Sequence, residues 1–117
     1  MRPAELYRRG VLLPKDSLAL VRLEAGDIEP ATAVEHLPIS ESLWPRCWAL
    51  INDINRVCGT DLHDRETGIV ELEQLPRMIE HLRTRRYTHA EEGEFAQELA
   101  ELGRRAVEAR MPVFFVL

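Results

Sequence analysis

The 117-residue sequence has only one lysine, two cysteines and no long apolar segment. Its longest apolar stretch, residues 111–117, is too short to cross a bilayer, because a spanning helix needs about 20 apolar residues. The N-terminal region carries Glu5, and its apolar run of residues 11–13 stops at Pro14, which does not fit a secretory signal. The sequence therefore predicts a cytoplasmic protein that does not enter the membrane.

The two cysteines are too few and too far apart for a disulfide framework. On one helix, Cys47 and Cys58 would lie about 16 Å apart along the axis, beyond disulfide reach. Cys58 followed by His63 suggests a thiol nucleophile with its base, but a helix C-terminus raises the pKa of a thiol. We expect both cysteines to be reduced, buried and non-catalytic.

Sequence signatures of common enzymes are also missing. The chain has no glycine-rich phosphate loop, nucleophile-elbow serine, paired CxxC or dinucleotide-binding fingerprint. The densest set of metal-ligand residue types is Asp61, His63, Asp64 and Glu66. Counted from Asp61, an EF-hand loop needs glycine at the sixth position, where Glu66 stands. We expect no metal, no cofactor and no catalytic residue, although these absences do not exclude an enzyme.

The charge is acidic and unevenly distributed. Twenty acidic against fifteen basic residues give a formal net charge of −5, which opposes binding to nucleic acid. Residues 24–41 contain five acids and no lysine or arginine, and residues 91–101 repeat that balance. These blocks are either solvated surface or an acidic face that attracts a basic protein partner.

The hydrophobic pattern predicts one α+β domain over residues 1–117, with two to three main helices packed on a small sheet. Periodic apolar residues, capping serines and prolines in first turns place the main helices. We expect these helices at residues 40–58, 76–86 and 90–110, strands at 17–23 and 113–117, a short helix at 3–9 and a loop at 27–38. Residues 69–72 are either a short strand or the approach to the next helix.

The two apolar strands predict how the sheet is assembled. Each strand is apolar throughout and needs cover on both faces, so we expect residues 113–117 to lie beside residues 18–23. Arg83, Arg85 and Arg86 fall at the end of a predicted helix, where cations complement the partial negative charge of the helix end. That position is a sufficient structural reason for the arginine cluster.

Two tryptophans one helical turn apart are the strongest candidates for a binding surface. Trp44 and Trp48 flank an apolar stripe that already has six members, so they either complete the core or form an exposed patch. Tryptophan is usually mostly buried, which favours the core. Together with Glu91 and Glu94, the pair forms our predicted partner-binding surface.

The region from Leu43 to Leu117 resembles several small bacterial families, some of which are immunity proteins of polymorphic toxin systems. Three features carry the resemblance: the aromatic helix start at residues 43–48, the segment at 52–55, and an amphipathic helix leading into residues 112–117. It covers about two-thirds of the chain. The resemblance implies a toxin-neutralising protein but assigns no functional residue.

Three hypotheses follow for the function. The first is a small bacterial binding protein, an immunity or toxin-neutralising factor, whose acidic and aromatic surface engages another protein. The alternative is a small hydrolase or ligand-binding enzyme with a site near His63, Asp64 and Glu66, which requires these side chains to converge on a pocket. The third is self-association through a free edge of the C-terminal strand.

Overall fold

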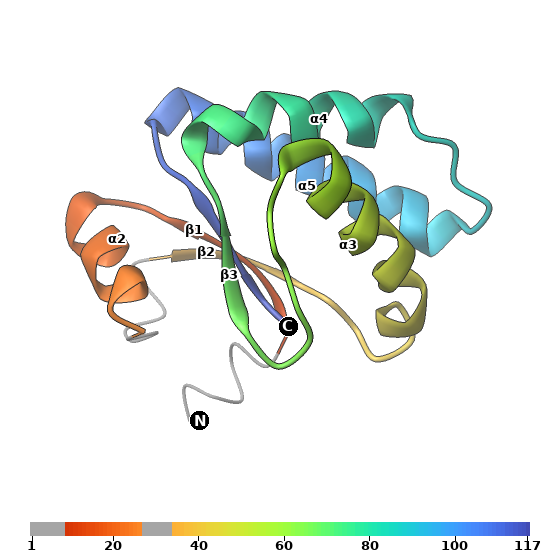
Figure 1. The fold of residues 1–117 in the computed structure, drawn as a ribbon, viewed down its shortest axis with the longest axis horizontal. Coiled ribbons are helices and arrows are strands. Elements are labelled where there is room, and N and C mark those ends of the chain that lie inside the picture. Colours follow the sequence, from red (N-terminus) through yellow and green to blue (C-terminus); the bar gives the residue numbers. More distant parts are fainter. Residues whose placement is uncertain (1–8, 27–33) are drawn as a thin grey trace.

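The computed structural model describes residues 9–26 and 34–117, which form an α+β fold (Figure 1). The described strands make one antiparallel sheet in the order β2-β1-β4-β3. The strands are β1 (Gly10–Pro14), β2 (Val34–Pro38), β3 (Thr67–Val70) and β4 (Val113–Val116). The α-helices are α2 (Ser17–Glu24), α3 (Trp44–Cys58), α4 (Leu75–Thr84) and α5 (Ala90–Ala109), and the short 3-10 helix η2 (Leu72–Gln74) precedes α4. The predicted fold class is confirmed, including the C-terminal strand in the sheet.

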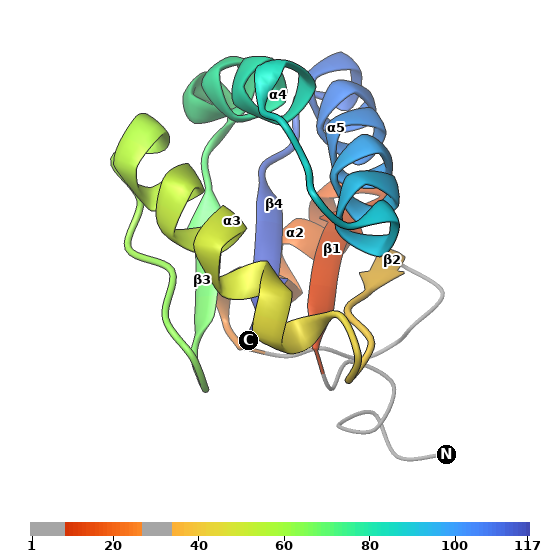
Figure 2. The same ribbon diagram turned by 90° about the vertical axis from the view of Figure 1, so that its right-hand side faces the viewer.

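The helices cover the two faces of the sheet unequally. In Figure 1, α2 lies on one side of the sheet and α3, α4 and α5 lie on the other, and Figure 2 shows α3 in front of the strands and α2 behind them. Adjacent residues of β4 point to opposite faces. Phe115 packs in the large core under α3, α4 and α5, whereas Phe114 packs with Ala19 and Leu23 of α2.

The helix α3 ends where its sequence predicts but begins at Trp44, four residues after the predicted start. Ser40 accepts a hydrogen bond from the Leu43 N–H at 3.2 Å, and Pro45 lies in the first turn, where no intrahelical N–H bond is lost. Gly59 ends the helix with a φ of 71°, a left-handed conformation that glycine adopts without strain. The buried face of α3 consists of Cys47, Leu50, Ile51, Ile54 and Cys58.

The helices α4 and α5 pack closely because one of them carries a glycine at the contact. Gly103 of α5 is buried, and a Cβ atom there would lie 3.1 Å from side-chain atoms of Met78 and Ile79. Leu99 and Leu102 of α5 are buried on the same side of the helix. The ends of both helices match the predicted ranges to within two residues.

The segment predicted as a strand at residues 17–23 is instead the helix α2. Asp16 caps it by accepting a hydrogen bond from the Ala19 N–H at 2.8 Å. Only Ala19 and Leu23 of α2 are buried, while Leu18 and Val21 are 60% and 62% exposed. Because apolar residues occupy both sides of this helix, the sequence does not show the 3.6-residue spacing of apolar residues that usually identifies a helix.

The strand next to β4 is therefore also different from the predicted one. Residues 10–14 form β1, which pairs with both β2 and β4, and residues 34–38 form β2 rather than a loop. Short apolar runs such as 11–13 and 17–23 are ambiguous between strand and helix, and here the first forms the strand and the second the helix. The predicted helix at residues 3–9 and the predicted loop at 27–33 lie outside the described residues, apart from Arg9.

The β3 segment resolves the alternative at residues 69–72. Thr67–Val70 is a strand, paired with β4 in an antiparallel register that puts Ile69 opposite Phe114. β4 consequently lies between β1 and β3, and the edges of the sheet are β2 and β3. The hypothesis of self-association through a free edge of the C-terminal strand is wrong in that respect.

None of the helices in the described ranges combines the length and the apolar character that crossing a bilayer requires.

Candidate functional site

An acidic groove runs between the edge strand β2 and the helix α5. It has a volume of about 620 Å³. Leu37 and Leu102 contribute apolar surface, and the remaining walls are mainly polar. The acidic side chains on the groove are Glu35 of β2 and Glu94, Glu98 and Glu101 of α5. A fully extended peptide or a loop of another protein is the kind of object that such an open groove can hold.

Among the described residues, two of these glutamates form no ion pair. Glu35 pairs with Arg105, and Glu101 pairs with Arg104 at 3.0 Å. Glu94 and Glu98, which are both exposed, make no ion pair with any residue in the described ranges. They lie four residues apart on α5, a spacing at which like charges destabilise a helix by about 0.2–0.5 kcal/mol. The groove therefore presents uncompensated negative charge.

The tryptophans lie together at the start of α3. The ring centroids of Trp44 and Trp48 are 5.4 Å apart and the rings are tilted by 39°. Trp44 is partly buried against the core, and the guanidinium of Arg9 lies 4.0 Å from its ring centroid. Trp48 is 36% exposed. Of the two predicted alternatives, core packing describes Trp44 and an exposed position describes Trp48.

Glu91 connects the tryptophan end of α3 to the groove. Its carboxylate accepts a hydrogen bond from the Ser42 hydroxyl at 3.0 Å and lies 3.8 Å from the guanidinium of Arg46. Glu94 follows one turn later on α5 and lines the groove. Glu91 therefore links the beginning of α3 to the first turn of α5, and Glu94 lies one turn further along α5. Whether they bind a partner stays a prediction.

The residues of the alternative site near His63 line neither the groove beside α5 nor the open hollow between α3 and α4. His63 lies 2.6 Å from Asp61, whereas Asp64 lies 3.7 Å from Arg9. His63, Asp64 and Glu66 are all exposed, and none of them lines the groove between β2 and α5. In the described ranges, no three His, Cys, Asp or Glu side chains gather in a way that could hold a metal ion. Whether this loop carries an enzyme site stays a prediction.

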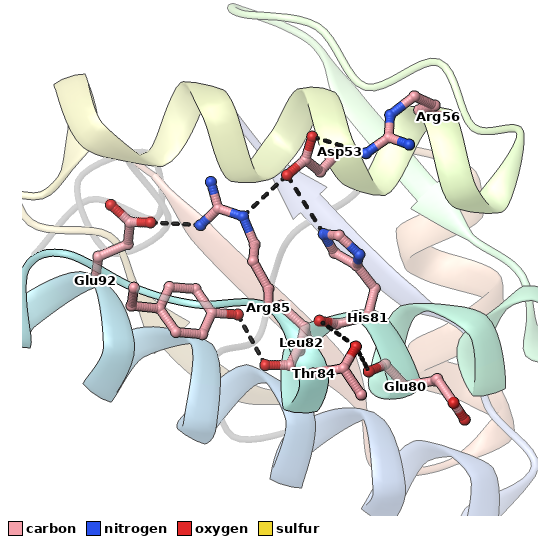
Figure 3. Close-up of polar contacts among 9 residues, drawn as sticks. Asp53, Arg56, Glu80, His81, Leu82, Thr84, Arg85 and Glu92 are labelled. Carbon is pink, nitrogen blue, oxygen red and sulfur yellow. Dashed lines mark hydrogen bonds and ion pairs between the residues drawn. The ribbon is translucent and has the colours of Figure 1, made fainter.

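A polar network that the sequence did not reveal joins α3, α4 and α5 (Figure 3). Arg85, just after α4, donates to Asp53 of α3 at 2.9 Å and to Glu92 of α5 at 2.5 Å. Its guanidinium also lies 5.2 Å from the ring centroid of Tyr87. Glu92 is only 7% exposed, so Arg85 compensates a nearly buried charge. Arg85 lies at the C-cap of α4, at the helix end where the sequence predicts it, and these ionic contacts are an additional role.

The network shifts the ionisation of its members in consistent directions. Burial alone would raise the pKa of Asp53, but hydrogen bonds from Arg56 and Arg85 hold this pKa below its usual value. Burial would lower the pKa of Arg85, and its contacts with Glu92 and Asp53 raise the pKa instead. The acid and base thus remain charged together.

A histidine belongs to the same network and borders an open hollow of about 580 Å³ between α3 and α4. His81 Nε2 lies 3.4 Å from Asp53, an arrangement that could orient a general base. The hydroxyl on that hollow, Thr84, donates to the Glu80 carbonyl oxygen at 2.9 Å. It is therefore a helix-capping group rather than an activated nucleophile, and we assign the network to stability.

The cysteines are in environments that suppress reactivity. Burial and the nearby Glu92 carboxylate raise the pKa of Cys47 to about 12. Burial also raises the pKa of Cys58, although Arg77 opposes that shift. Both thiols are free and buried, as the sequence predicts.

The chain matches no protein-family model, no curated protein and no solved structure. The function is therefore argued from the geometry of the site.

Proposed function

We propose that this protein is a binding protein that engages a basic segment of another protein through its acidic groove and the adjoining tryptophans. The observation that carries the proposal is that Glu94 and Glu98, on a groove open enough for a peptide, form no ion pair within the part of the chain that the structure describes. An arginine or lysine side chain placed there would relieve the like-charge repulsion on α5. The apolar walls would cover its aliphatic stem.

The tryptophan pair extends the proposed surface beyond the groove. Large aromatic side chains often supply much of the binding energy at protein interfaces. Trp48 is exposed at the edge of the core, and Trp44 beneath it holds it in place through ring contact.

A toxin-neutralising role is one form of this proposal. An immunity protein needs a rigid surface whose charge complements that of the toxin, and it needs no reactive centre. The resemblance of residues 43–117 to families that include immunity proteins points in the same direction. Charge complementarity between such a protein and a basic toxin would raise the association rate as well as the specificity. A gene for a basic toxin beside the gene for this protein would support this form.

Binding of a synthetic peptide tests the proposal directly. A fluorescein-labelled peptide that alternates arginine with valine should raise its anisotropy on titration with the protein, and more weakly as salt screens the charges. The same peptide with glutamate in place of arginine should not bind. Reversal of the groove charge in the double variant Glu94→Lys with Glu98→Lys should weaken binding by about tenfold or more, since about 1.4 kcal/mol is tenfold.

A matched charge reversal on the same helix serves as the control. Glu108 is exposed on α5, pairs with Arg104 and does not line the groove. Glu108→Lys changes the net charge of the protein in the same sense and should leave peptide affinity nearly unchanged. Equal binding by wild type and the Glu94→Lys, Glu98→Lys variant would contradict the proposal, as would a preference for the glutamate peptide.

A further inference from the structure

An ion pair crosses the acidic groove near one of its ends. The Arg105 guanidinium of α5 donates to the Glu35 carboxylate of β2 through two nitrogens, and its Nε lies 3.3 Å from Glu35 Oε2. Toward the other end, the Ser40 hydroxyl lies 3.5 Å from the Glu91 carboxylate. β2 and α5 therefore run in opposite directions along the groove, and its Glu35 end is already occupied by a cation.

Arg105 occupies the position that a basic side chain of a partner would take. Among the described residues that line the groove, it is the one arginine or lysine. Its guanidinium is the same chemical group as that of a partner's arginine. Glu94 and Glu98, nearer the start of α5, form no ion pair within the described ranges. The unbound groove is thus negative along Glu94 and Glu98 and neutralised at Glu35.

The ion pair between Arg105 and Glu35 is suited to exchange because it is open to solvent. The two side chains are 43% and 40% exposed. An exposed ion pair adds little to stability, since water screens the charges and both side chains lose rotamer freedom. A partner's arginine that replaced Arg105 would form the same charge-assisted hydrogen bonds with the Glu35 carboxylate. Arg105 would return to water, so the exchange costs the protein little.

We propose that Arg105 is an internal competitor for the partner, displaced from Glu35 by a basic side chain of the bound segment. The proposal rests on the function proposed above and makes Arg105 the residue that limits affinity for a basic segment. A segment that reaches only Glu94 and Glu98 leaves the ion pair in place. A segment with a further basic residue opens it.

The spacing of the carboxylates defines the segment that this exchange requires. Glu94 and Glu98 are four residues apart on α5, about 6 Å along the axis. Alternate residues of an extended strand share one side and lie about 7 Å apart, so two arginines at alternate positions match these glutamates. A third arginine, two residues further along, lies toward the Glu35 end. The partner is therefore an extended segment with basic residues at three alternate positions.

Anisotropy titrations with a peptide of three alternate arginines separated by valines test the proposal. Arg105→Gln removes the competitor and should bind this peptide about tenfold more tightly than the wild type, whereas Glu35→Gln should bind it about tenfold more weakly. The variant with both substitutions should return to near the wild-type affinity. Arg77→Gln removes the same charge from an exposed arginine on α4, outside the groove, and should leave the affinity nearly unchanged.

A second peptide, with one terminal arginine replaced by glutamine, separates displacement from a general effect of charge. If the third arginine contacts Glu35, the shorter basic pattern should erase the gain that Arg105→Gln produces, because no basic side chain then reaches Glu35. A gain that persists with the second peptide comes from general electrostatic attraction and would overturn the proposal.

The Arg105 side chain gives an independent readout in ¹⁵N NMR spectra of the wild type. Its Nε–H, bonded to Glu35 in the unbound protein, should shift and exchange faster with water when the three-arginine peptide binds. The Nε–H of Arg104, which donates to Glu101 at 3.3 Å, is the control that should change little. An Arg105 signal that does not move on binding would contradict displacement.

The results also separate this proposal from the proposed function. If the wild type binds the peptide but Arg105→Gln binds it no more tightly, the internal competitor is wrong and the proposed function stands. Equal weakening by Arg105→Gln and Glu35→Gln would also overturn it, since a pair that only holds β2 against α5 gives that result. If neither the wild type nor Arg105→Gln binds the peptide, both proposals fail. Circular dichroism verifies that each variant is folded.

Discussion

The two faces of the sheet are built from similar apolar residues but are covered to very different depths. Under α3, α4 and α5 lies a continuous core that includes Leu50, Ile51 and Phe115, all fully buried. On the other face, among the described residues, only the eight-residue helix α2 covers the strands, with Phe114 at the centre of a small cluster. The comparison indicates that most of the folding energy lies on the first face, whereas the second contributes less.

The largest test of this comparison uses two neighbouring phenylalanines of one strand. Phe115→Ala should lower the free energy of unfolding by about 4–5 kcal/mol, because the surrounding core cannot collapse around the cavity. Phe114→Ala should cost about 3 kcal/mol, since the short helix α2 can move toward the space. Chemical denaturation of both variants measures the difference. Equal losses would show that the two faces contribute equally.

The network of Figure 3 should give the next largest effect, because it ties together the three helices of the first face. Arg85→Ala leaves the nearly buried Glu92 carboxylate without its partner and should cost about 3 kcal/mol. Arg104→Ala, which removes an exposed arginine from α5, should cost less than about 0.5 kcal/mol. If the two variants lose the same stability in denaturant, the network is only a surface feature.

Acidification should weaken the same network in a predictable direction. The pKa of Asp53 is lower in the folded protein than its ordinary value, so its contribution to stability is complete at neutral pH. That contribution is lost as the pH falls below about 4 and passes through the folded pKa. Asp53→Asn should therefore flatten the acid limb of a plot of unfolding free energy against pH. If the acid limb of this plot has the same slope in the Asp53→Asn variant, these contacts do not lower the pKa of Asp53.

The smallest predicted effect is on the outer side of α2. Leu18 and Val21 are more than half exposed, so replacing both by serine removes little buried area and should change the stability by less than about 0.5 kcal/mol. Thermal unfolding of the Leu18→Ser, Val21→Ser variant measures this. A loss of several kcal/mol would mean that this helix face is covered in solution.

The same contrast explains which elements could be predicted from the sequence. The helices α3, α4 and α5 each have one clear apolar face against a deep core. The short apolar run after Pro112 forms the strand β4, as predicted. The helix α2 covers a thin cluster with Ala19 and Leu23 and exposes Leu18 and Val21, so its pattern contains no helical face. Asp16 before Ser17 was a capping signal that could have identified it.

The candidate site was only partly accessible from the sequence for a related reason. Trp44, Trp48, Glu91 and Glu94 were recognisable from residue type and spacing. The groove itself needs Glu35 beside α5, and this proximity depends on β2, which was predicted as a loop. Arg85 and Asp53 are 32 residues apart, so no local pattern indicates their contact.

The most direct test of the proposed function is where a basic peptide binds. In NMR spectra of the ¹⁵N-labelled protein, titration with the arginine and valine peptide should shift the amides of β2, the amides of Glu94 and Glu98, and the indole N–H of Trp48. Shifts concentrated instead on residues 61–66, or spread evenly over the surface, would contradict the assignment of binding to the acidic groove and the tryptophans.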